Sequence, residues 1–294
     1  MNGPDIAADP RHPRRPDRPD RPARPDRVYS GYVFDLDGTL YLGEAPIPGA
    51  AATIARLRDA GARILFVTNN PTRLPATYAA KLTDMGIPAI REDVVTSTDS
   101  LLRYLRIHAP GARVLPIGEP LLHDLLADDG VALTGDPAHA QVVVVAWDRT
   151  FDYAKLTAAF RAVRAGARIV ATNPDPYCPT PEGGLPDCAA MLAAIEACTG
   201  VRAESIVGKP SSHMAATVLA RLDLAPGDTI VIGDRMLTDV AMARNAGMHA
   251  ALVLTGAASR DDIPDGGPDG GPDGGPDAPD FVLDDVTQLL PDPT

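Results

Sequence analysis

Short runs of aliphatic and β-branched residues alternate along the chain with longer segments whose apolar residues recur at helical spacing. The clearest predicted strands cover residues 32–34, 64–67, 142–145 and 230–232, and the clearest predicted helices cover residues 50–60, 76–85, 153–164 and 214–222. Regular β–α alternation predicts right-handed crossovers and a doubly wound parallel α/β sheet. The number of β–α units exceeds what one compact sheet usually holds, so we expect two α/β domains.

Polar residues follow four of the aliphatic runs. The four segments read DLDGTLY over 35–41, TNN over 68–70, GKP over 208–210 and GDRMLTD over 233–239. Because ligands of open α/β sheets bind outside the carboxyl ends of the strands, we expect these segments to meet at one sheet edge.

The residue types in these segments point to phosphoryl chemistry on a metal ion. Clustered carboxylates repel one another, and a hard divalent cation such as Mg²⁺ relieves that repulsion. A lysine and a threonine hydroxyl nearby suit the oxygens of a phosphoryl group. Asp35 and Asp37 are two residues apart, so on an extended strand they point the same way. One carboxylate could then attack phosphorus, forming an aspartyl-phosphate, while the other handles a proton.

Taken in order, the four segments resemble the four motifs of the haloacid dehalogenase superfamily of phosphotransferases. The resemblance implies a Rossmann-like core over residues 28–104 and 203–294, with an inserted α/β cap of the C2 type over 105–202. The stretch ATNPDPY over 171–177, followed by PEG over 181–183, resembles the branch of NagD and the 4-nitrophenylphosphatases.

The resemblance also implies a role for each motif residue. Asp35 would be the nucleophile and a Mg²⁺ ligand, and Asp37 would be the general acid and base with its backbone carbonyl on Mg²⁺. The Thr68 hydroxyl and the Asn69 backbone N–H would bind the phosphoryl group. Lys209 would bridge the nucleophile and the phosphoryl group.

The remaining motif residues would complete the metal site and the entrance. Asp234 would ligate Mg²⁺ directly, and Asp239 would either orient a metal-bound water or hold Lys209. Asp187 would bind substrate by lining or supporting the entrance from the cap. Three residues stay open between a role at the entrance or site and a purely local one: Asn173, Asp175 and Arg235.

Two segments lack apolar periodicity and are predicted to be disordered. Residues 1–27 form an arm rich in proline and arginine, and residues 261–280 repeat PDGG as a flexible acidic loop before a last short strand and helical turn over 281–290. The whole chain carries a formal net charge of −12, which disfavours nucleic-acid binding. We find no membrane-spanning run and no secretory signal, so we expect a cytoplasmic protein.

The sequence therefore predicts a Mg²⁺-dependent phosphatase that acts on small phosphorylated metabolites. Sugar or polyol phosphates are the favoured substrates, with aryl phosphates such as 4-nitrophenyl phosphate as further candidates. The alternatives are a phosphotransferase or phosphomutase on the same core, and a non-catalytic sensor of a phosphometabolite. Since members of this branch often dimerise through the cap, we also expect a homodimer.

Overall fold

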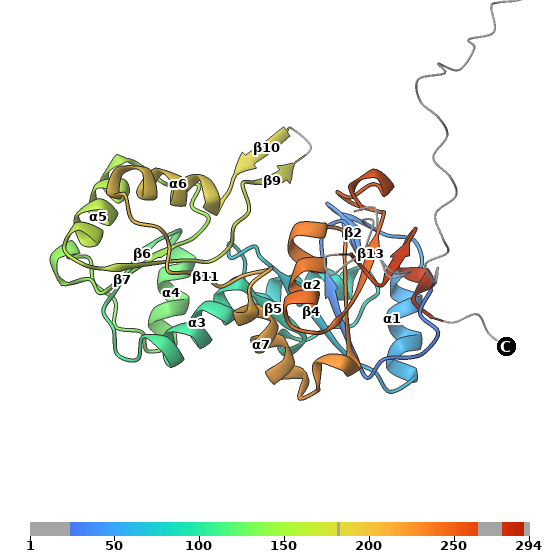
Figure 1. Ribbon diagram of the computed structural model, residues 1–294. Helices are drawn as coiled ribbons and strands as arrows, with labels where there is room; N and C mark the ends of the chain where they lie inside the picture. The colour runs from blue at the N-terminus through green and yellow to red at the C-terminus, as the bar shows by residue number, and fades with distance from the viewer. Residues whose placement is uncertain (1–23, 181–182, 264–277, 291–294) are drawn as a thin grey trace, which may run out of the picture.

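The fold is built on two parallel sheets, each covered by helices. The computed structural model describes residues 24–180, 183–263 and 278–290 (Figure 1). The predicted parallel α/β architecture is confirmed. Most of the predicted arm over 1–27 and of the predicted acidic loop over 261–280 lies outside the described residues.

The larger sheet, which with its helices is called the core, has six parallel strands. In spatial order they are β14 (Phe281–Leu283), β13 (His249–Val253), β12 (Thr229–Gly233), β1 (Gly31–Asp35), β4 (Arg63–Thr68) and β5 (Val94–Thr96). The chain starts at the centre, moves out to β4 and β5, and later fills the other side from β12. The carboxyl ends of β1 and β12 therefore flank the topological switch point, where open α/β sheets bind ligands.

Alternating side chains bury both faces of this sheet. Tyr32 and Phe34 of β1 face one apolar layer and Val33 faces the other. The first layer is completed by α1 (Ala50–Asp59), α2 (Pro75–Asp84) and the 3₁₀ turn η6 (Val286–Leu289), and the second by α7 (Ser212–Leu222) and α8 (Ala241–Asn245). A sheet covered on both faces explains why its strands read as nearly continuous apolar runs.

The smaller sheet, which with its helices is called the cap, has four parallel strands. They are β11 (Ser205–Ile206), β8 (Arg168–Ala171), β7 (Val142–Val145) and β6 (Val114–Ile117). The helices α3 (Ser97–His108) and α4 (Pro120–Asp128) cover one face, and α5 (Tyr153–Arg164) and α6 (Cys188–Thr199) cover the other. The strand β11 lies after residue 202 and pairs with this sheet. The domain boundaries of the cap at residues 105 and 202 stay predictions.

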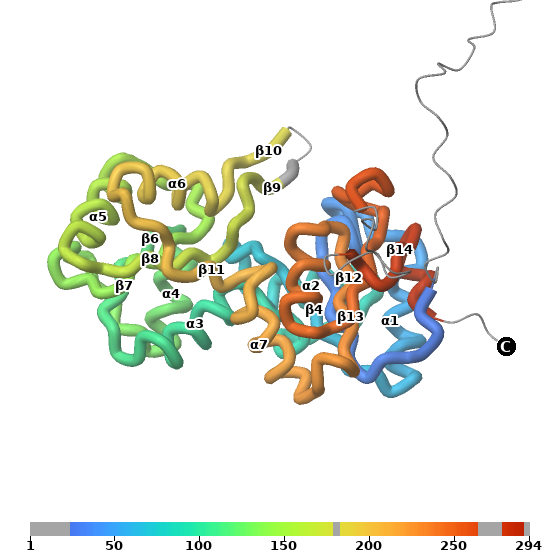
Figure 2. The backbone as a smooth tube through the Cα atoms, viewed as in Figure 1, coloured from blue at the N-terminus to red at the C-terminus, as the bar shows by residue number. Residues whose placement is uncertain are grey.

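Several elements were absent from the sequence prediction. They are the strand β5, the helix α3, the hairpin β2–β3 (Tyr41–Leu42 and Ala45–Pro46) and the hairpin β9–β10 (Tyr177–Thr180 and Gly183–Pro186). The hairpin β9–β10 projects from the cap on the side of the core (Figure 1). The tube view in Figure 2 shows the chain returning from this hairpin through α6 and β11 to the core.

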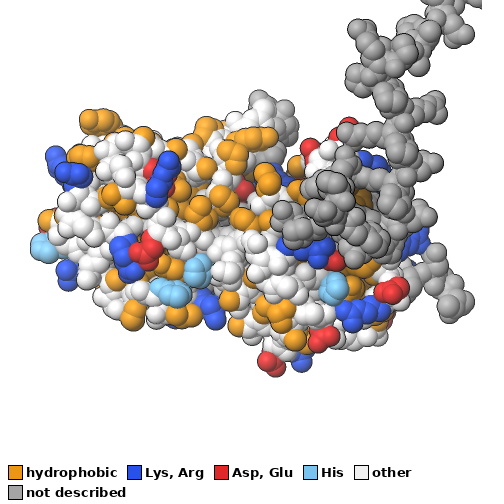
Figure 3. Space-filling view, in the orientation of Figure 1, with side chains coloured by type: hydrophobic (Ala, Val, Ile, Leu, Met, Phe, Trp, Pro, Cys, Tyr) orange, Lys and Arg blue, Asp and Glu red, His pale blue; other side chains and the backbone are white. Residues whose placement is uncertain are grey.

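The end of the described chain agrees with the sequence. The predicted strand and helical turn over 281–290 are present as β14 and η6. Within the described ranges, none of the helices has the length and apolar character needed to cross a bilayer. Figure 3 shows basic and acidic side chains interspersed on the visible face of the described residues.

Candidate active site

Three of the four motif segments follow strands of the core sheet and meet at its switch point, as the sequence predicts. The fourth, GKP over 208–210, follows β11 of the cap sheet, so the prediction of one shared sheet edge is wrong for this segment. Asp35 is the last residue of β1, Thr68 is the last residue of β4, and Asp234 directly follows β12. Since β1 pairs in parallel with both β4 and β12, all three residues lie at the same sheet edge.

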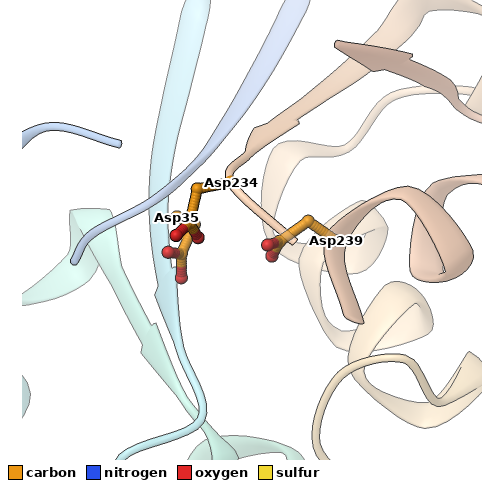
Figure 4. A group of neighbouring side chains, drawn as sticks. All are labelled: Asp35, Asp234 and Asp239. Carbon is orange, nitrogen blue, oxygen red and sulfur yellow. The ribbon is translucent and has the colours of Figure 1, made fainter. Parts of the chain in front are cut away.

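Three carboxylates from these segments form one cluster. One oxygen from each of Asp35, Asp234 and Asp239 lies within 4.8 Å of the others. Figure 4 shows Asp35 and Asp234 side by side, with the carboxylate of Asp239 pointing toward them. Asp239 belongs to the π-helix η4 (Met236–Val240), an irregular turn of the kind often found at functional sites.

The cluster is electrostatically strained. Burial raises the pKa of Asp35 well above its ordinary value, and Asp239 and Asp234 add to that rise while Lys209 opposes it. Burial and the charge of Asp239 likewise raise the pKa of Asp234. Like charges held together out of water favour either protonation or a bound cation.

Lys209 supplies one positive charge to this cluster. Its Nζ donates to Oδ1 of Asp35 and to Oδ1 of Asp239, the latter at 2.7 Å, and the residue is only 4% exposed. Burial alone would lower the pKa of Lys209, but Asp239 and Asp35 outweigh it and raise the pKa. Of the two roles predicted for Asp239, the hydrogen bond matches the one in which it holds Lys209.

Glycines let the backbone pack directly against the carboxylates. A Cβ on Gly38 would stand 2.3 Å from Oδ2 of Asp234, and one on Gly256 would stand 2.0 Å from the same atom. A Cβ on Gly233 would stand 2.2 Å from Cγ of Asp239. Gly38 also has a φ of 84°, which L-residues with a side chain rarely adopt. The space around the two carboxylates is therefore closed to any larger residue.

The donor set fits a hard divalent cation. Oδ2 of Asp234 accepts from the backbone N–H of Ala257 at 2.7 Å, whereas Oδ1 is buried and has no hydrogen-bond partner in the described part of the chain. A buried oxygen without a partner is costly unless a ligand satisfies it. Carboxylate oxygens close enough to share one ion are the ligands that Mg²⁺ and Ca²⁺ prefer.

Asp37 is not one of the three carboxylates of this cluster. The strand β1 ends at Asp35, so the strand alternation that would turn both carboxylates the same way does not reach Asp37, which lies in the following turn. Burial raises the pKa of Asp37, while Lys81 and a hydrogen bond from the Tyr41 hydroxyl oppose the rise. The Lys81 ammonium lies 4.0 Å from the centre of the Tyr41 ring. A carboxyl group with a raised pKa suits proton transfer.

Asn69 connects the core to two other segments through its side chain. Its Oδ1 accepts from the backbone N–H of Lys209 at 2.7 Å, and its Nδ2 donates to the Lys209 carbonyl and, at 2.9 Å, to Oδ2 of Asp175 in the cap. The Asn69 carbonyl accepts from Nδ2 of Asn173 at 3.1 Å. Asn69 and Thr68 are both buried, and Oγ1 of Thr68 accepts from the Asn70 N–H. The predicted contacts of Thr68 and Asn69 with a phosphoryl group stay predictions.

Asp187 is placed differently from the motif residues. It is the N-cap of α6, where its carboxylate accepts from the Cys188 N–H, and it is 4% exposed. Burial raises its pKa to about 6. The position matches a residue that supports the entrance from the cap, and its binding to substrate stays a prediction.

A crevice of about 1260 Å³ opens beside Asp234. Core residues of its wall include Asp234 and Arg235, and cap residues include Asp175 and Tyr177. The ion pair between Arg235 and Asp175, with Nη1 and Oδ1 3.9 Å apart, crosses from core to cap. The sequence left both residues open because nothing in it shows that their segments meet.

Two matches to known families cover most of the core. Residues 32–132 match the haloacid dehalogenase-like hydrolases, and residues 206–289 match a second HAD-hydrolase-like family. A 5′-nucleotidase of Bacillus subtilis is 35% identical over 81% of this chain and 92% of its own length. The chain belongs to the haloacid dehalogenase-like hydrolases. A second relative in this family, the sugar-phosphatase AraL of Bacillus subtilis, is 35% identical over 88% of this chain and 93% of its own length.

Solved structures of haloacid dehalogenase-like hydrolases share the whole two-sheet fold. A 4-nitrophenylphosphatase from Thermotoga maritima is 30% identical with a TM-score of 0.80, covering 89% of this chain and 96% of its own. A glycerol phosphate phosphatase from Mycobacterium tuberculosis, solved in complex with magnesium, is 35% identical with a TM-score of 0.79, covering 89% of this chain and 76% of its own. The resemblance to this branch, predicted from the motifs, is confirmed.

Proposed function

We propose that this hydrolase cleaves small phosphomonoesters through an aspartyl-phosphate on Asp35. The observation that carries the proposal is the cluster of Asp35, Asp234 and Asp239 with Lys209 bonded to two of its members. The cluster lies at the switch point of the core sheet, and the chain belongs to a family of hydrolases. Named phosphatases among the relatives support the same chemistry.

The first step uses Asp35 and Asp37. A carboxylate oxygen of Asp35 attacks phosphorus as the ester P–O bond breaks, and Asp37 gives its proton to the leaving oxygen. Asp37 then takes a proton from water, which attacks the phosphorus of the aspartyl-phosphate. The P–O bond to Asp35 breaks, inorganic phosphate leaves, and both carboxyl groups return to their starting states. The raised pKa of Asp37 favours the protonated form that this first step needs.

The remaining residues bind and orient. The Thr68 hydroxyl and the Asn69 N–H would donate to the phosphoryl oxygens, and Lys209 would temper the charge between them and Asp35. Asp239 keeps Lys209 in place through its 2.7 Å hydrogen bond.

We propose Mg²⁺ as the metal. Asp35, Asp234 and the Asp37 carbonyl would hold it, and the unpartnered Oδ1 of Asp234 is the atom that most needs such a ligand. Bound Mg²⁺ would neutralise developing negative charge on the phosphoryl group. The magnesium complex of the glycerol phosphate phosphatase supports this choice.

Sugar and polyol phosphates are the substrates we favour. Relatives named as a sugar phosphatase and a glycerol phosphate phosphatase support that class of substrate. Because another relative is named as a 5′-nucleotidase, nucleotides are the competing substrate class that an assay must test. We also propose a homodimer formed through the cap, where two aromatic side chains of α5, Tyr153 and Phe160, are exposed. Light scattering on the purified protein tests the dimer, and the cytoplasmic location stays a prediction.

The test is phosphate release from a panel of glycerol phosphate, sugar phosphates, 5′-nucleotides and 4-nitrophenyl phosphate. We expect release that needs Mg²⁺, stops with chelator and is lost in Asp35→Asn. Asp124→Asn, which removes an exposed carboxylate on the cap helix α4, is the matched control and should keep full activity. Release that continues in Asp35→Asn would refute the assignment, and turnover only with an added sugar acceptor would indicate a phosphotransferase.

A further inference from the structure

Asp175 lies at the base of the cap hairpin β9–β10 and contacts the core at two points. Its Oδ2 accepts from Nδ2 of Asn69 at 2.9 Å, and its Oδ1 faces Nη1 of Arg235 at 3.9 Å. Both partners lie just beyond core strands. Asn69 directly follows β4, and Arg235 is the second residue after β12. One carboxylate therefore ties the cap to the two segments that carry the candidate site.

Asp175 is fixed within the cap by backbone contacts. Its N–H donates to Oδ1 of Asn173 at 3.1 Å, and its carbonyl accepts from the N–H of Ala189 in α6 at 3.1 Å. The N–H of Asp187 donates to the neighbouring Pro176 carbonyl at 3.0 Å, at the point where the hairpin returns to α6. The Asp175 side chain is therefore held in a fixed position relative to both the hairpin and α6.

Arg235 is fixed within the core. It follows the candidate metal ligand Asp234, and its N–H donates to Oδ2 of Asp239 at 3.2 Å. Its guanidinium is partly exposed on the wall of the crevice. Among the described residues that line this crevice, Arg235 is the arginine or lysine whose side chain faces Asp175.

We propose that the ion pair of Asp175 and Arg235 is a latch that holds the cap hairpin over the phosphoryl site, and that both are positioning residues for the reaction. This inference rests on the proposed hydrolase function. Closing a site excludes water and fixes the substrate against the reacting groups. A partly exposed pair at 3.9 Å is weak, so the latch can open in every catalytic cycle to release product.

A double-mutant cycle tests the latch on hydrolysis of 4-nitrophenyl phosphate. Arg235→Gln and Asp175→Asn each remove one charge, and Asn at 175 keeps an acceptor for Asn69. We expect each single variant to lower kcat/KM about tenfold, and the double variant to be no worse than either single one. Arg235→Lys keeps the charge and should restore part of the loss.

Hydrogen exchange gives a readout that does not depend on activity. Peptides spanning the hairpin should exchange faster in Arg235→Gln than in the wild type. The matched control is Arg244→Gln, which removes a partly exposed ion pair with Asp280, 3.0 Å long, inside the core. It should leave both kcat/KM and hairpin exchange unchanged.

The outcomes separate the two proposals. A wild type that hydrolyses no ester refutes the proposed function, and exchange of the hairpin then still decides the latch. A wild type that is active, with single effects that multiply to about a hundredfold in the double variant, overturns the latch. Unchanged hairpin exchange in Arg235→Gln overturns it as well.

Discussion

Replacing Lys209 with Met should destabilise the protein in a way that Mg²⁺ reverses. The Lys209 ammonium is buried and bonded to Asp35 and Asp239. Removing one partner of a buried ion pair costs about 3–5 kcal/mol because the remaining charge has no compensation. Met keeps most of the volume of the lysine stem, so the expected loss is electrostatic. Without metal at pH 7.5, the free energy of unfolding should fall by about that amount.

The loss should shrink with Mg²⁺ and with acid. A bound cation replaces the missing positive charge, and the raised pKa of Asp35 means that moderate acid protonates the cluster before ordinary carboxylates. The assay is urea unfolding followed by far-UV circular dichroism, with chelator or Mg²⁺, at pH 7.5 and pH 5. Trp147 is buried in the apolar interior of the cap, so its fluorescence alone would not follow unfolding of the larger sheet and its helices.

The matched control is Lys155→Met in the cap. Nζ of Lys155 lies 2.5 Å from Oδ2 of the fully buried Asp148 carboxylate, far in sequence from the candidate metal ligands. We expect a loss of similar size that Mg²⁺ does not reverse. The reasoning is refuted if Lys209→Met is as stable as the wild type in chelator, or if Mg²⁺ restores both variants equally.

Two further variants test the packing and the charges around the site. Gly256→Ala would place a Cβ 2.0 Å from Oδ2 of Asp234, so the Mg²⁺ concentration for half-maximal activity should rise about tenfold or more. The control is Gly227→Ala, whose new Cβ would have no other atom within 4 Å, and it should leave this concentration unchanged. Asp187 has a pKa of about 6 when folded against 3.8 in the unfolded chain, so unfolding releases a proton between these values and stability falls as pH rises through that window. Asp187→Asn removes this buried charge and keeps an N-cap for α6, so the free energy of unfolding at pH 7.5 should rise by about 1–3 kcal/mol. Calorimetry should also show a weaker pH dependence of stability between pH 4 and 6. A variant that is less stable than the wild type at pH 7.5 would contradict the cost of burying this charge.

The sequence predicts the core sheet and the convergence of its motifs because both depend on local patterns. Aliphatic runs followed by polar residues identify β1, β4 and β12, and parallel pairing alone brings Asp35, Thr68 and Asp234 to one edge. The contact of Lys209 with Asp35 spans 174 residues, and it was predicted from the family motif order rather than from spacing.

The elements missed by the sequence prediction have weaker local signals. The strand β5 has only three residues, and its recognition depends on pairing with β4. The helix α3 does carry a signal, a capping box in which Thr96 and Asp99 exchange hydrogen bonds, and that pattern could have identified it. The two strands of the hairpin β9–β10 together contain two prolines and two glycines, which obscure strand alternation.

Side-chain contacts between distant segments could not be read from the sequence. The expectation that Asp37 points the same way as Asp35 stays a prediction, because the strand β1 ends at Asp35. The contact between Asp175 and Arg235 depends on how the cap meets the core, which no local pattern encodes.

The central claim is a covalent phosphoryl group on Asp35. The variant Asp37→Asn, given 4-nitrophenyl phosphate labelled at phosphorus, should accumulate this aspartyl-phosphate. Its formation needs no general acid, because 4-nitrophenolate leaves without a proton, whereas its hydrolysis loses the general base. With Mg²⁺, we expect a burst of one nitrophenolate per active site, and label retained after acid quench on the peptide that contains Asp35. No burst and no labelled peptide, while the wild type releases phosphate from the same ester, would contradict the account.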